Sequence, residues 1–179
     1  MTAITTVRFI AVGALVLCAA DLRATDSRGE PKGADARVTV QVAGSGVDLL
    51  NTAMVHSQEP TATGMIQKST ETVELTGGLT GRVLYHVTSV FDFVNNTLVN
   101  TGDQVYSGTV AGSAPVLIHD DQFRFDVNLV TGQEHGQVFL FNHLAGPKVR
   151  CQLDVTGTGM NADGNPTFTY TGQCTFRGQ

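Results

Sequence analysis

Apolar residues occupy every second position along much of the chain, from Arg37 onward. In the run from Val83 to Phe93, one face carries Val, Tyr, Ser and Phe side chains, and the other includes His86 and Asp92. A period of two is typical of a β-strand that buries one face. The same alternation recurs in residues 38–42, 72–76, 122–129, 137–144, 149–155 and 167–177.

Short turn signals separate these runs. They are rich in Gly, Asn, Asp and Pro, which suit tight turns. The signals are Thr76-Gly77-Gly78, Asn95-Asn96, Gly112-Ser113, Thr131-Gly132, Gly146-Pro147 and Asp163-Gly164. About eight antiparallel strands joined at hairpin spacing must close or fold over to protect their edges. The pattern therefore predicts an all-β domain over residues 37–179, and we favour a single antiparallel barrel over a sandwich.

The last hairpin can be aligned in detail. A loop centred between Ala162 and Asp163 places Cys151 opposite Cys174 and gives both strands one apolar face. Opposed residues on neighbouring strands are close enough for a disulfide. A two-residue turn at Asp163 and Gly164 would misalign the cysteines. We therefore predict the longer loop and a structural Cys151–Cys174 disulfide.

Two regions lack the alternation. Residues 21–36 are polar, with charges of both signs, and are expected to form a disordered leader. The segment Asn51–Thr63 reads as a second loose region. The neighbouring stretch Val47–Val55 fits either one short helical turn or a strand, and the sequence does not decide between them.

The first twenty residues predict a secretory signal peptide. Arg8 is the single charge before the apolar run Phe9–Leu17, and Cys18-Ala19-Ala20 supplies the small residues that precede cleavage after Ala20. A membrane anchor is the alternative, but the uncharged stretch from Phe9 to Ala20 is about 12 residues and a spanning helix needs about 20. A lipid on Cys18 is a second alternative, disfavoured by the bulky Leu17. The expected location is secreted or periplasmic.

Composition narrows the function classes. The chain has 23 Thr, 22 Val and 20 Gly among 179 residues, a balance that favours strands and turns over helices. With 11 basic and 16 acidic residues the net charge is −5, and losing Arg8 with the signal makes it −6. With no basic cluster, nucleic acid is not an expected partner. No later segment approaches membrane-spanning length, and removal of the signal leaves an even pair of cysteines.

Residues 64–178 carry features of a known superfamily. These are Gly77-Gly78-Leu79-Thr80-Gly81, Phe91-Asp92-Phe93, Gly108-Thr109-Val110-Ala111-Gly112-Ser113 and Tyr170-Thr171-Gly172. In these turn and packing features the chain resembles the small barrels of the allene oxide cyclase and dirigent-like superfamily. The resemblance implies a barrel that controls cyclisation or coupling of small apolar substrates inside it, and no catalytic motif of that family transfers residue by residue. Lipocalins are similar in shape, but their Gly-x-Trp motif is absent because the chain has no Trp.

A few polar residues are candidates for chemistry. In an unbroken strand, His119 and Asp121 would share the face of Phe123 and Phe125, and could serve as an acid–base pair or bind a metal. The alternative is a bulge at Asp120 that turns the acids to solvent. Tyr85 and Tyr170 lie on apolar faces, where a phenol either donates a hydrogen bond to a substrate oxygen or packs against a backbone carbonyl. The dipeptide Glu134-His135 is expected in a solvated loop.

Three functions remain open. The first is binding of a small apolar ligand inside the barrel. The second is a cofactor-free isomerase or cyclase that uses His119, Asp121 or Tyr85. The third is a structural or interaction domain with a solid core. No cofactor or metal is expected, and the oligomeric state is not determined. The residues expected to line a ligand site are Tyr85, Phe91, Phe123, Phe125, Phe141 and Tyr170.

Overall fold

The computed structural model describes residues 37–178, so the predicted signal peptide and leader lie outside it. This part of the chain consists of ten strands and no helix, and thus holds no helix that could cross a membrane. The strands are β1 (Arg37–Pro60), β2 (Gly64–Gly77), β3 (Leu79–Asp92), β4 (Thr97–Val110), β5 (Val116–Asp120), β6 (Arg124–Asn128), β7 (Glu134–Leu140), β8 (Asn142–Ala145), β9 (Val149–Met160) and β10 (Pro166–Arg177).

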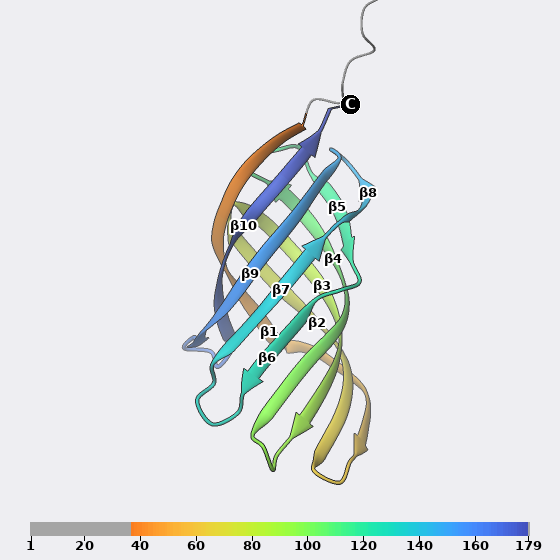
Figure 1. Ribbon diagram of the computed structural model, residues 1–179, viewed down its shortest axis with the longest axis vertical. Helices are drawn as coiled ribbons and strands as arrows, with labels where there is room; N and C mark the ends of the chain where they lie inside the picture. Colours follow the sequence, from red (N-terminus) through yellow and green to blue (C-terminus); the bar gives the residue numbers. More distant parts are fainter. Residues whose placement is uncertain (1–36, 179) are drawn as a thin grey trace, which may run out of the picture. The chain divides into compact units, whose positions relative to one another are not determined.

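The strands form a closed, eight-stranded antiparallel barrel, as the sequence predicts (Figure 1). Strand β1 pairs with both β2 and β10, and the ladder continues through β3 and β4 on one side and β9 and β7 on the other. Strands β5 and β6 pair with successive segments of β4. On their other edges, β5 pairs with β8 and β6 pairs with β7. Ten strands thus fill eight positions, because two positions hold an interrupted strand.

The first strand is longer than the sequence pattern indicates. It runs for 24 residues to Pro60, so the expectation of a loose region from Asn51 is wrong. Register shifts between Leu49 and Met54 and between Val55 and Ser57 let the strand keep its pairing with β2. Such bulges insert residues that break the alternation, which is why the pattern is not visible in the sequence.

The C-terminal hairpin has the predicted register. Cys151 faces Cys174 across β9 and β10, and their sulfurs lie at disulfide distance, 2.07 Å, with both residues fully buried. The turn lies between Met160 and Pro166, which is the longer of the two loops considered. A register shift at Thr167 and Phe168 accommodates it.

Replacing both cysteines, as Cys151→Ala with Cys174→Ala, is expected to lower the free energy of unfolding by roughly 3 kcal/mol, the loop-entropy value for a closed loop of this size. Cys151 and Cys174 are 23 residues apart in the sequence. Urea unfolding checks the loss, and mass mapping of unreduced peptides should link the two cysteines. Free thiols in protein recovered from outside the cytoplasm would contradict the pairing.

One end of the barrel is filled by packed side chains. Leu79, Tyr106, Val110 and Ile118 are fully buried there. The Tyr170 hydroxyl donates toward the carbonyl oxygens of residues 76 and 79 and accepts from the amide of residue 79, at 2.7–3.0 Å. This phenol ties β10 to the turn between β2 and β3, so the closed end is both packed and hydrogen-bonded.

Candidate functional site

The barrel encloses a cavity of about 440 Å³ in the half that lies away from the packed end. Its walls are mainly apolar, with Val73, Val87, Leu153 and other inward side chains of several strands. The cavity reaches the end that carries the β3–β4, β6–β7 and β9–β10 turns, the lower end in Figure 1. Lining residues there include Met160, which is 65% exposed. The cavity is therefore open to solvent at this end.

Four of the six residues expected to line a ligand site do line this cavity: Tyr85, Phe91, Phe125 and Tyr170. Phe123 is buried behind it, with its ring centroid 4.7 Å from that of Tyr85. The expectation for Phe141 is wrong. On β7, Val138 and Leu140 point inward, so the alternation turns Phe141 to the outer surface, where the guanidinium of Arg150 lies 5.8 Å from its ring centroid.

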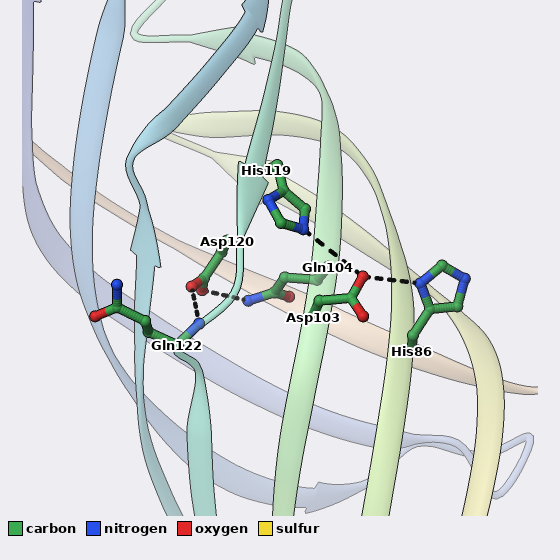
Figure 2. A network of polar contacts seen from close by, with 6 residues as sticks. All are labelled: His86, Asp103, Gln104, His119, Asp120 and Gln122. Carbon is green, nitrogen blue, oxygen red and sulfur yellow. Dashed lines mark hydrogen bonds and ion pairs between the residues drawn. The ribbon is translucent and has the colours of Figure 1, made fainter.

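His119 lies on the outer surface of the barrel. Its Nε2 is 3.7 Å from Oδ1 of Asp103, which also contacts Nδ1 of His86 at 3.1 Å (Figure 2). All three side chains are partly exposed. Inward positions on β5 belong instead to Val116, Ile118 and Asp120, so His119 does not reach the cavity.

A break in the strand explains why the expected His119–Asp121 pair does not form at an apolar face. Residues 121–123 separate β5 from β6, which shifts the alternation, so that Phe123 and Phe125 are buried while Asp121 is exposed. The bulge alternative is correct for Asp121 but not for Asp120, which is fully buried.

The buried carboxylate of Asp120 stabilises the break between β5 and β6. Its carboxylate accepts hydrogen bonds from the Gln104 side chain at 2.9 Å, the Gln122 backbone N–H at 2.8 Å and the Phe139 backbone N–H at 2.9 Å. Figure 2 shows the carboxylate beside Gln104 and Gln122. The side chain thus pairs groups that the missing ladder would have satisfied, and we assign it a structural role.

Three acidic side chains line the cavity: Asp48 from β1, Glu71 from β2 and Glu134 from β7. Glu71 lies opposite Tyr85 in the β2–β3 ladder. Glu134 lies next to Gly157, where a Cβ would come within 2.8 Å of the Cβ of Glu134. The missing side chain of Gly157 leaves room for the side chain of Glu134. We call these three residues the acidic cluster.

Burial and neighbouring charges change how Asp48 and Glu134 ionise. Burial, followed by the charge and hydrogen bond of Glu71 and the charge of Glu134, raises the pKa of Asp48 to about 8. Burial also raises the pKa of Glu134, and the pKa of Tyr85 is raised well above its usual value by burial and then by the acidic cluster. At neutral pH the Asp48 carboxyl is therefore mostly protonated.

Several polar groups at the cavity lack a partner within residues 37–178. Buried oxygens of Asp48 (Oδ1) and Asn100 (Oδ1) have no hydrogen-bond donor there. Tyr85 and Ser89 are each 7% exposed, line the cavity, and make no side-chain hydrogen bond to a described residue. Such orphaned groups are uncommon in protein interiors, and here they face one space.

Sequence reasoning missed the acidic cluster. Glu134 was expected in a solvated loop, because the preceding Gly132 signals a turn, yet it begins β7 with its side chain inward. Asp48 falls in the stretch left open between helix and strand. Glu71 was detectable, since the alternation of β2 places it on the face of Val73 and Leu75, where an acid is unexpected.

Comparisons with protein-family models, with curated proteins and with solved structures find no match to this chain. The agreement with allene oxide cyclase and dirigent-like barrels is therefore one of architecture, the closed antiparallel barrel.

Proposed function

We propose that this protein is an exported barrel that binds a small, mainly apolar molecule in its cavity. The carrying observation is the cavity of about 440 Å³, with mainly apolar walls and a few polar groups. That volume and lining are typical of small-molecule sites. The secretory signal pattern and the Cys151–Cys174 pair support export.

The open end of the barrel supports entry of an apolar molecule. Phe93 and Val94 in the β3–β4 turn, Val130 in the β6–β7 turn and Met160 at the end of β9 are all more than half exposed. Apolar side chains held in water around a cavity mouth are typical of binding sites for apolar partners.

Ser89→Trp is expected to weaken binding of the neutral fluorophore Nile red at least tenfold, because the indole occupies the cavity beside Asn100. Val90→Trp is the matched control, since Val90 is the next residue on β3 and is 40% exposed on the outer face. A fluorescence titration measures both dissociation constants, and thermal melting checks that both variants fold.

A second cavity-filling variant provides the same test if Ser89→Trp does not fold. Val155→Phe narrows the cavity from β9, four strand positions away from β3 in the closed barrel. Equal binding of Nile red by wild type and both folded blocking variants would place the dye elsewhere and contradict the proposal.

The acidic cluster gives a second candidate, a cofactor-free isomerase or cyclase in the same cavity. A carboxyl group that stays protonated near pH 7, as the raised pKa of Asp48 indicates, can donate a proton to a carbonyl or epoxide oxygen. The test is incubation with the molecule that the protein retains, followed by chiral chromatography. Conversion that Asp48→Asn abolishes, with binding intact, would favour the enzyme; an unchanged molecule would favour the binding protein.

A further inference from the structure

We propose that the molecule bound in this cavity is an amphipathic amine, whose protonated nitrogen lies at the acidic cluster and whose apolar body fills the rest of the space. This inference rests on the proposed binding function and specifies its ligand class.

The charge of the site is one-sided. Asp48, Glu71 and Glu134 line the cavity, and the residues that line it include no Lys, Arg or His. The titratable groups that face Asp48 from neighbouring elements are Glu71 on β2, Tyr85 on β3 and Glu134 on β7. Asp48 hydrogen-bonds Glu71, and Glu71 accepts from the Ser69 hydroxyl, but neither acid meets a basic group among the lining residues. Buried acids are normally paired with a base, so a cation from outside the chain is the missing partner.

The unpaired hydrogen-bonding groups of the site also favour a cationic ligand. The unpaired buried atoms in the described part of the chain are two acceptor oxygens, one on Asp48 and one on Asn100, and both residues line the cavity. Tyr85 and Ser89, each more than nine-tenths buried, add unpartnered hydroxyl groups to the same wall. An ammonium group offers donors and no acceptor, which suits unpaired carboxylate and amide oxygens.

Asp120 shows what a structural buried acid looks like in the same barrel. Three protein donors, at 2.8–2.9 Å, satisfy its carboxylate. Asp48 instead keeps a buried oxygen without a donor. A buried acid with one oxygen left unsatisfied is unfavourable for stability, and such groups concentrate at functional sites.

A metal ion is the competing cation, and the geometry disfavours it. Within residues 37–178, no three His, Cys, Asp or Glu side chains are arranged to hold a metal. The apolar walls of the cavity also suit an organic cation better than a hydrated divalent one.

The test compares three ligands with one skeleton by calorimetry at pH 7 on the exported protein: 4-phenylbutylamine, 4-phenyl-1-butanol and 4-phenylbutyrate. We expect the amine to bind at least tenfold more tightly than the alcohol, and the carboxylate more weakly than the alcohol. Charge-assisted hydrogen bonds are about twice as strong as neutral ones, which gives a preference of this order.

Substitutions in the acidic cluster test whether these residues cause the preference for the amine. Asp48→Asn and Glu71→Gln keep the side-chain shapes and should each reduce the preference for the amine over the alcohol by about tenfold, with alcohol binding retained. Glu74→Gln is the control, since Glu74 lies on the outer face of β2 and pairs with Arg82 at 2.7 Å. It should leave the preference unchanged.

The possible outcomes distinguish failure of the amine proposal from failure of the proposed small-molecule binding. If the alcohol binds as tightly as the amine, or if Ca²⁺ at equal concentration displaces the amine, the inference is overturned and binding in the cavity stands. If all three compounds and Nile red fail to bind, the proposed function itself fails. A preference for the amine that survives both Asp48→Asn and Glu71→Gln would also overturn the inference.

Discussion

Replacing Asp120 with Ala is expected to destabilise the barrel by about 3–5 kcal/mol, because it orphans buried donors and opens a void. The change leaves the backbone N–H of Phe139 and the side-chain amide of Gln104 without their acceptor. Both groups lie at the break between β5 and β6, where the regular ladder offers no substitute. Urea unfolding of the variant measures the loss.

Asp121→Ala is the matched control. Asp121 is the next residue, but it is exposed, so its loss should change the free energy of unfolding by no more than about 0.5 kcal/mol. Similar stability of the two variants would contradict the role that we assign to Asp120.

Asp48→Asn is expected to stabilise the unliganded protein at pH 7, on the order of 4 kcal/mol. The unfolded carboxyl ionises near 3.8, whereas the folded one stays protonated up to about 8. Wild-type stability therefore falls as the pH rises through this window, by about 1.4 kcal/mol per pH unit from this group. The variant has no such group and keeps an amide that can still hydrogen-bond Glu71.

Unfolding measured at pH 4.5, 7 and 8.5 tests this effect. The two proteins should be close in stability at pH 4.5, and the variant should gain most at pH 8.5. Glu134, whose pKa is also raised, gives a slope of the same sign and leaves part of the pH dependence in the variant. Glu74→Gln, on the outer face, should follow wild type. A destabilised Asp48→Asn protein would contradict the raised pKa of the Asp48 carboxyl.

Regular features of the fold were accessible from the sequence. The Cys151–Cys174 register follows from strict alternation, and closure of the barrel follows from the number of short-linked strands, whose edges need protection. Irregular features of the fold could not be predicted from the sequence. The break after Asp120 reverses which residues face inward, so an unbroken alternation places both His119 and Asp121 on the wrong face.

The acidic cluster shows a different limit of sequence reasoning. Its members come from β1, β2 and β7, and their proximity depends on strand tilt and closure, which alternation does not give. Their acidity was also misleading, since isolated acids in a sequence are usually solvated. The clearest clue was Glu71 on an otherwise apolar face.

The stability cost of Asp48 and the proposed ligand are connected. An apolar interior would be more stable without the acidic cluster, and a cation bound to the folded state would offset its repulsion. We therefore expect a bound amine to stabilise wild type more than the Asp48→Asn protein, in contrast to their order without ligand.

Native mass spectrometry of the protein purified from its own host tests the central claim most directly. We predict a population that retains one small organic molecule, which is lost from Ser89→Trp and kept by the outer-face variant Val90→Trp. Wild-type protein that carries no such molecule, and that also fails to take up Nile red, would contradict the claim that this barrel is a small-molecule binding protein.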